Sequence, residues 1–299
     1  MSGAPGGSAR GALALAGSGV LFASTFLVVQ RAVEDAEPLP FLGARFLIAA
    51  AVLYPFVRRR PSSRDEVRLG IAVGAALSVS YLLQTTGLRH TETSTSAFIT
   101  YLLVVIVPLI VAVVDRRRPE PRVALGVAVA TAGLWLLSGG PGGGLGLGEL
   151  LTLACAVGFA GHVVAVGRFA GRLDPVRFTF VQLLTVGVVC GVPGLFVGGY
   201  RFGAVAWAGA AFTGVFATAV AFFGMVTGQR TVPPARAALI LLIEPVCAGL
   251  LGVATGEELG WSGLAGALLI LAAIGIVEVL PLLRGDVADD PAVEPTVHG

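Results

Sequence analysis

The chain has 299 residues, of which 56% are hydrophobic and 13% are charged, and its formal net charge is +2. A soluble domain typically carries about 25% charged residues, and the mean hydropathy of this chain is +0.88. This composition excludes a soluble globular protein and predicts a chain that lies mostly in lipid.

Long uncharged segments, divided by glycine, proline and arginine clusters, predict ten membrane-spanning helices. A helix needs about 20 residues to cross roughly 30 Å of hydrocarbon. The expected spans are 11–31, 39–57, 68–88, 95–114, 121–138, 147–167, 177–198, 203–228, 235–255 and 260–283. We therefore expect an all-α polytopic membrane protein.

The two ends of the chain differ from this apolar body. Residues 1–10 form a short N-terminal segment, and residues 284–299 are acidic without an apolar period, so we expect a disordered tail there. Arg10 before an apolar run also resembles a signal peptide. We expect a retained helix instead, because a similar segment recurs in mid-chain as a span.

The first span is repeated later in the chain. Gly11 to Phe41 aligns without a gap with Gly148 to Phe178, at an offset of 137 residues. The same offset pairs Pro38 with Pro175, Arg31 with Arg168, Pro108 with Pro245 and Glu120 with Glu257. A repeat of this length predicts two homologous halves, at 11–138 and 148–283, joined by a glycine-rich linker at 139–147.

The basic residues predict the orientation of the spans. All twenty are arginines, and sixteen lie at the chain ends or in alternate loops, where the positive-inside rule predicts cytoplasm. Arg31, Arg89 and Arg201 fall on the other, periplasmic side, together with the linker. Both termini are expected in the cytoplasm, and five spans per half then place the second half upside down, as two inverted five-helix repeats. The arginine clusters are explained by topology and do not indicate nucleic-acid binding.

Polar side chains within the spans mark a candidate pathway between the halves. Small and polar residues recur at spacings of three or four on several helices, which predicts a lined cavity or, alternatively, close helix packing. Larger polar groups are harder to explain by packing. The candidate substrate-binding residues are Thr25, Arg45, Tyr81, Gln84, Thr100, Tyr101, His162 and Glu244.

Three of these residues carry the strongest functional hypotheses, and each has a structural alternative. Glu244 either caps a helix break before Pro245 or handles substrate or protons. Arg45 either snorkels to the interface or pairs with a substrate carboxylate. His162 is either a neutral, hydrogen-bonded residue or a titrating relay. The repeat sets Thr25 against His162, Arg45 against Gln182 and Val107 against Glu244, and these unlike pairs are where substrate and coupling chemistry is expected.

Pro108 and Pro245 occupy equivalent positions inside their predicted helices. Each removes one backbone hydrogen bond, so we expect kinks. Matched kinks are candidate hinges, although static packing explains them too.

The sequence lacks the motifs of several enzyme activities. There is no Walker sequence, no His-Glu-x-x-His helix and no Gly-x-Ser-x-Gly elbow. His90, His162 and His298 are scattered, and three cysteines lie within separate spans, so neither a metal cluster nor a disulfide framework is expected. We expect a protein that is not an enzyme and has no cofactor.

The chain resembles the EamA-type ten-helix exporters of the drug/metabolite transporter superfamily over about residues 11–283. The resemblance rests on Phe22 to Phe26, on Pro38 with Phe41 to Phe46, on Thr95 to Ala97 leading to Pro108, on Glu244-Pro245 with Gly256-Glu257, and on the glycine pattern Gly263 to Gly275. It implies two inverted five-helix halves around a substrate cavity, and relatives that export amino acids and similar metabolites.

These observations predict a secondary transporter in the cytoplasmic membrane that exports a small polar metabolite, an amino acid or a related compound, by alternating access. Its expected partners are the solute, the lipid bilayer and protons as a coupling ion. The alternative is a flippase for a lipid-linked or amphipathic substrate. The sequence leaves substrate identity, coupling ion and oligomeric state open.

Overall fold

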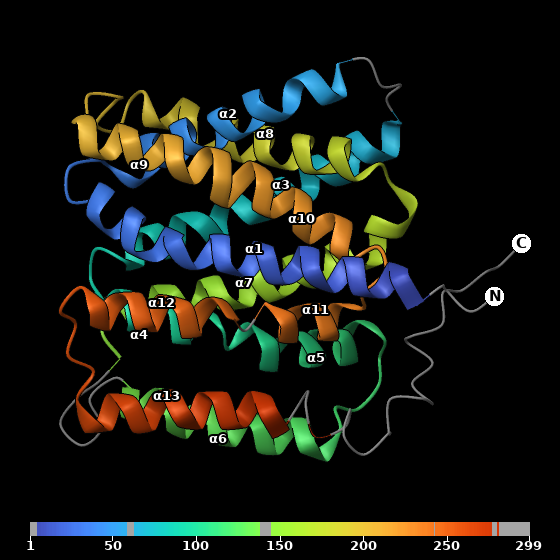
Figure 1. Cartoon of the computed structure of the whole chain (residues 1–299), viewed down its shortest axis with the longest axis vertical. Helices are drawn as coiled ribbons and strands as arrows, with labels where there is room; N and C mark the ends of the chain where they lie inside the picture. Colours follow the sequence, from blue (N-terminus) through green and yellow to red (C-terminus); the bar gives the residue numbers. More distant parts are fainter. Residues whose placement is uncertain (1–4, 59–62, 138–144, 242, 277–279, 281–299) are drawn as a thin grey trace, which may run out of the picture.

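The computed structural model describes residues 5–58, 63–137, 145–241, 243–276 and 280, and within these ranges the fold is helical, without strands. The helices lie side by side in one bundle (Figure 1). In chain order they are α1 (Pro5–Ala32), α2 (Pro38–Val57), α3 (Arg64–Gly87), α4 (Thr93–Thr100), α5 (Leu103–Val114), α6 (Pro121–Leu137), α7 (Leu147–Phe169), α8 (Pro175–Gly194), α9 (Ala204–Gly214), α10 (Ala221–Gly228), α11 (Pro234–Ile240), α12 (Ile243–Ala254) and α13 (Gly260–Ile274). Most of the predicted linker, the acidic tail and residues 277–279 and 281–283 of the last predicted span lie outside the described residues.

Eight segments in the described part of the chain are long and apolar enough to cross a membrane. They are Ala9–Ala32, Pro38–Val57, Arg64–Gly87, Thr93–Val114, Leu147–Arg172, Pro175–Gly194, Ala204–Gly228 and Arg236–Ala254. They coincide with eight of the expected spans. The remaining two expected spans correspond to shorter apolar helices, α6 with 17 residues and α13 with 15.

Three of the long segments are interrupted where the sequence led us to expect continuous helices. The segment Thr93–Val114 breaks at Tyr101–Leu102, between α4 and α5. The last long segment breaks between α11 and α12, next to Leu241. A π-helical turn, Val215–Val220, joins α9 to α10. Such irregular backbone is tolerated at membrane depth where it is buried in protein or lines a cavity.

The interruptions do not coincide with the two prolines that we named as candidate hinges. Pro108 lies inside α5, several residues after the break at Tyr101–Leu102. Pro245 lies in the first turn of α12, where a missing backbone N–H costs little because the first turn of a helix leaves its N–H groups unpaired anyway. The helices are therefore interrupted ahead of each proline.

The helices pack in matching pairs. α2 packs along α8, and α6 packs along α13 at one edge of the bundle (Figure 1). α3 contacts α7 and α8, while α9 and α10 contact α1 and α2 in the corresponding way. The α2–α8 crossing is close because Gly43 and Gly191 face each other there, and a Cβ on Gly43 would overlap Gly191 and the Tyr200 hydroxyl.

Contacts between loops define the two ends of the bundle. At one end, Arg177 lies 3.6 Å from Glu66, Arg168 pairs with Asp115, and the Asp174 N–H donates to Glu66. We name this the arginine-rich end, because the α2–α3, α5–α6, α7–α8 and α10–α11 connections here contain most of the loop arginines. The first described turn of α1 and the end of α13 lie at the same end (Figure 1).

The opposite end is fastened by another set of contacts. Arg89 pairs with Glu37 at 2.9 Å, and Asp35 accepts from the Gly203 N–H. Glu257 accepts hydrogen bonds from the Thr93 and Ser94 N–H groups at 2.8 and 2.9 Å, and so caps the start of α4. These contacts join connections from both halves of the chain.

Candidate functional site

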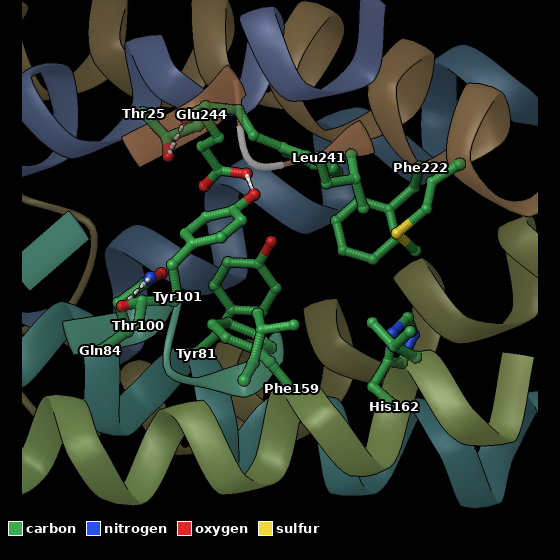
Figure 2. A pocket seen from close by; sticks show the side chains of 14 residues that line it. Thr25, Tyr81, Gln84, Thr100, Tyr101, Phe159, His162, Phe222, Leu241 and Glu244 are labelled. Atoms are coloured by element: carbon green, nitrogen blue, oxygen red, sulfur yellow. Dashed lines mark hydrogen bonds between the residues drawn. The ribbon is translucent and has the colours of Figure 1, made fainter. Parts of the chain in front are cut away.

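A cavity lies in the middle of the bundle, between α1, α3, the α4–α5 break, α7, α10 and the α11–α12 break (Figure 2). Its empty volume, including its opening, is about 570 Å³. The lining residues come from both halves of the chain and are Phe22, Thr25, Tyr81, Gln84, Thr100, Tyr101, Leu103, Phe159, His162, Val163, Phe222, Met225, Leu241 and Glu244.

The acidic side of the cavity is formed by Glu244 and Tyr101. The Tyr101 hydroxyl donates a hydrogen bond of 2.5 Å to Glu244 Oε2. Both side chains are buried and lie at a helix interruption: Tyr101 lies in the α4–α5 break, and Glu244 is the second residue of α12, just after the other break. The bond therefore joins the two interrupted segments on one side of the cavity, as Figure 2 shows.

Neutral polar groups lie beside this pair. Gln84 Nε2 lies 3.5 Å from Thr100 Oγ1, which in turn is 3.8 Å from the Cys155 thiol. Thr25 donates to the carbonyl oxygen of Phe22 in its own helix, at 2.7 Å. Amide and hydroxyl groups of this kind can both donate and accept, so this side of the cavity can bind an uncharged polar group of a solute.

His162 lies on the other side of the cavity from Glu244 (Figure 2). Its Nε2 is 2.8 Å from Oε1 of Gln182, a fully buried residue of α8. The imidazole also meets the edge of the Phe222 ring, with ring centroids 5.8 Å apart. His162 is thus hydrogen-bonded, as the structural alternative for this residue required, and it nevertheless faces the cavity.

Aromatic rings form the walls between these polar groups. Tyr81 contacts Phe159 and Phe46 edge to face, with centroids 5.0 and 4.8 Å apart. Phe22 meets Phe222 in the same way at 5.3 Å. Edge-to-face packing gives these rings fixed positions, so the cavity has apolar walls and a few polar groups, which is the usual composition of a small-molecule site.

Arg45 lies behind the cavity rather than in its lining. Its side chain is 1% exposed, its Nε donates to Thr218 Oγ1 at 2.8 Å, and its guanidinium carbon lies 5.1 Å from the centroid of the Tyr81 ring. It is close enough to Glu244 for electrostatic attraction. Direct pairing of Arg45 with a substrate carboxylate would therefore require Tyr81 to move. Snorkelling is contradicted by the full burial of the side chain.

The other seven candidate residues all line the cavity. The hinge candidates Pro108 and Pro245 do not, although Pro245 follows Glu244 directly. Sequence reasoning missed the ring of Phe159 and the role of Gln182 as the partner of His162. Phe159 stands one helical turn before His162, so helical spacing from the histidine is the signal that points to it. Among the described residues, no group of three or more His, Cys, Asp or Glu side chains could hold a metal ion.

Membrane-length helices around a buried cavity with converging polar groups define the class of protein, a polytopic membrane transporter. The chain belongs to the EamA-like transporter family, whose sequence model matches it twice, over residues 9–139 and 146–279. This family is consistent with the drug/metabolite transporter superfamily.

Similar proteins from two organisms carry transporter names. An uncharacterized transporter of Archaeoglobus fulgidus is 30% identical over 269 residues, covering 89% of this chain and 85% of the relative. The uncharacterized inner membrane transporter YedA of Escherichia coli is 27% identical over 258 residues, with 80% of each chain covered. A crystal structure of a protein 19% identical in sequence superposes with a TM-score of 0.68, over 91% of this chain and 98% of that one, and shows the same fold.

Proposed function

We propose that this protein is a secondary transporter that exports a small polar metabolite carrying an amino group, an amino acid or a related compound, across the cytoplasmic membrane. One observation carries the proposal: a buried carboxyl group, Glu244, faces a central cavity and is held there by Tyr101 from the other half of the chain. A buried acidic group that lines a cavity inside a membrane marks a site for ions or substrate.

The proposed topology has ten spans in two inverted halves, with both termini in the cytoplasm. Its support is threefold: the family model matches each half, the helices pack in matching pairs, and most loop arginines lie at one end of the bundle. The printed description of YedA as an inner membrane transporter supports the location. In this topology the arginine-rich end faces the cytoplasm.

Alternating access would expose the cavity to one side of the membrane at a time. The breaks beside Tyr101 and Leu241 and the matched Pro108 and Pro245 are the proposed bending points, since interrupted helices lack some backbone hydrogen bonds and bend at lower cost. Closing contacts are available at both ends, in Arg177 with Glu66 and in Glu257 with the start of α4.

The residues of the cavity have distinct proposed roles. The Glu244 carboxylate would pair with an ammonium group of the solute, and Gln84, Thr100 and Thr25 would bind its neutral polar groups. Arg45 would balance the charge of Glu244 from behind Tyr81 when no solute is bound. A proton and an ammonium group would compete for the same carboxylate, which is a simple means of coupling export to proton entry.

Solute flux into proteoliposomes tests this proposal. Purified protein should move at least one labelled amino acid or related amine faster than protein-free vesicles, and Glu244→Gln should abolish the movement. A panel of toxic amino acids and amine analogues, scored by growth of overexpressing cells, selects the compounds for the flux assay. If a lipid copurifies in stoichiometric amount and no water-soluble compound moves, the exporter proposal is wrong and the flippase alternative is favoured.

A further inference from the structure

Gln182 holds the imidazole of His162 from outside the cavity. His162 Nε2 lies 2.8 Å from Gln182 Oε1, and Gln182 Nε2 donates to the carbonyl oxygen of Phe178 at 3.2 Å. The second bond fixes the orientation of the amide. The reversed amide would place its oxygen against a carbonyl oxygen, and neither of these atoms can donate.

The amide orientation determines which ring nitrogen of His162 carries the hydrogen. Gln182 Oε1 can only accept, so His162 Nε2 must donate. In a neutral imidazole the other nitrogen, Nδ1, then keeps its lone pair. An ordinary imidazole is mostly neutral at pH 7, and among the described residues no carboxylate hydrogen-bonds to His162.

The Nδ1 atom is available to a solute. It has no hydrogen-bond partner in the described part of the chain, yet it is not among the fully enclosed polar atoms, and His162 lines the cavity. Figure 2 shows the imidazole and the Glu244 carboxyl group on opposite sides of the same space. The cavity therefore offers a hydrogen-bond acceptor at each side, with aromatic rings between them.

This arrangement disfavours a carboxylate on the solute. The guanidinium of Arg45 is separated from the cavity by the Tyr81 ring. A solute carboxylate would meet the lone pair of His162 or the acidic group of Glu244, and in return for its hydration it would gain only neutral donors such as the Gln84 amide, without a cationic partner. An ammonium group gains Glu244 as a partner and aromatic faces beside it.

We propose that Gln182 is a specificity-determining positioning residue: by holding His162 as the Nε2–H tautomer, it makes the cavity select amines that carry a second hydrogen-bond donor and no free carboxylate. This inference rests on the proposed function and narrows its substrate class from amino acids and related compounds to related amines that lack the carboxylate of an amino acid. Gln182 acts through His162, because it does not line the cavity itself.

Binding of three probes of similar size tests the selection. Tyramine has an ammonium group and a distal hydroxyl donor, O-methyltyramine lacks the donor, and tyrosine adds a carboxylate. We expect purified protein in nanodiscs to bind tyramine about 5- to 10-fold more tightly than O-methyltyramine, as one net hydrogen bond allows, and to bind tyrosine most weakly.

Two substitutions of Gln182 separate positioning from folding. Gln182→Leu removes the acceptor for Nε2–H. Tyramine and O-methyltyramine should then bind with nearly equal affinity, while amine binding through Glu244 remains. Gln182→Glu favours an imidazolium ring, whose Nδ1–H donates. The affinity for O-methyltyramine should therefore rise relative to the affinity for tyramine. Thr185→Val, one turn further along α8, where Thr185 bonds only to the Val181 carbonyl oxygen, should leave the preference unchanged.

The tautomer itself can be observed. Nitrogen NMR of the histidine-labelled protein, compared with His162→Asn, should show His162 protonated on Nε2 in the native protein and altered in Gln182→Leu. Protonation on Nδ1, equal binding of tyramine and O-methyltyramine, tighter binding of tyrosine, or no binding of any probe would overturn the inference. Flux is a separate measurement: selective binding without transport would contradict the proposed function and leave the inference standing.

Discussion

Tyr101 and Glu244, 143 residues apart in the chain, share a hydrogen bond of 2.5 Å that joins the two helix interruptions beside the cavity. A typical hydrogen bond within a protein contributes about 0.5–1.5 kcal/mol, and one to a charged group contributes more. The bond therefore holds the α4–α5 and α11–α12 interruptions together. A solute or proton that binds to Glu244 would affect the backbone at both interruptions.

Tyr101→Phe should lower the melting temperature and weaken binding of the transported amine, because Glu244 loses its donor while its burial is unchanged. The expected loss is about 1–3 kcal/mol, the cost of leaving a buried acceptor without its donor. Thermal unfolding in detergent and equilibrium binding measure the two effects. Tyr54→Phe is the matched control, since Tyr54 is 55% exposed and distant from the lining. Equal effects of both substitutions would contradict a special role for the Tyr101 hydroxyl.

Arg45→Met should destabilise the protein by about 1–3 kcal/mol, because it removes the positive charge near the Glu244 carboxyl group and the donor to Thr218. The double variant Arg45→Met with Glu244→Gln should recover part of this loss. Unfolding of the two single variants and the double variant gives the coupling between the sites. Strictly additive losses would show that Arg45 does not balance Glu244.

Gly43→Ala should destabilise the α2–α8 crossing by about 1–3 kcal/mol, because the added methyl group meets the backbone of Gly191, which cannot move aside without shifting a helix. Gly17→Ala is the control. Nothing lies within 4 Å of a Cβ at that position, so alanine should stabilise α1 by about 0.5–1 kcal/mol. Loss of stability in both variants would contradict the packing argument.

Glu92 lies at the end of the bundle opposite the arginine-rich end, and it makes the stability of the protein depend on pH. Partial burial, and then the charge of Glu257, raise the pKa of Glu92 above its usual value of 4.5. The stability that this group contributes is present below pH 4.5 and is lost as pH rises through the folded-state pKa. Glu92→Gln should therefore raise the melting temperature at pH 7 by a small amount, and the difference should vanish below about pH 4.5. A melting-temperature difference between the variant and the native protein that grows on acidification would contradict the raised pKa of Glu92.

Much of this fold follows from the residues because lipid restricts the alternatives. A backbone inside hydrocarbon must satisfy its own hydrogen bonds, so each long apolar run becomes a helix. The same restriction makes polar side chains in those runs informative. Tyr81, Tyr101, His162 and Glu244 were predicted on that ground alone, and all of them line the cavity.

Other features could not be predicted, for physical reasons. The aromatic walls involve residues such as Phe22 and Phe222, which look like any lipid-facing residue in a chain that is apolar on all sides. The position of Arg45 behind Tyr81 depends on how α2, α3 and the π-helical turn meet, and that is a tertiary property. The helix breaks lie ahead of the prolines because tertiary contacts, including the Tyr101–Glu244 bond, decide where the backbone departs from a helix.

Arg45 and Gln182 are equivalent in the two halves but support different groups of the cavity. The two residues occupy equivalent positions in the repeat, and each supports a different side of the cavity from behind. Arg45 is near Glu244, and Gln182 bonds to His162. Of the six residues in the three unlike pairs, Thr25, His162 and Glu244 line the cavity, and Arg45 and Gln182 lie behind it.

The most direct test is to block the cavity and measure transport. Thr25 lines the cavity, whereas Val20, five residues earlier in α1, is 49% exposed on the outer surface of the bundle. Thr25→Trp should abolish counterflow of a transported amine in proteoliposomes, and Val20→Trp should leave it intact, with both variants monodisperse and similar in melting temperature. Normal counterflow in folded Thr25→Trp protein would show that the solute does not pass through this cavity.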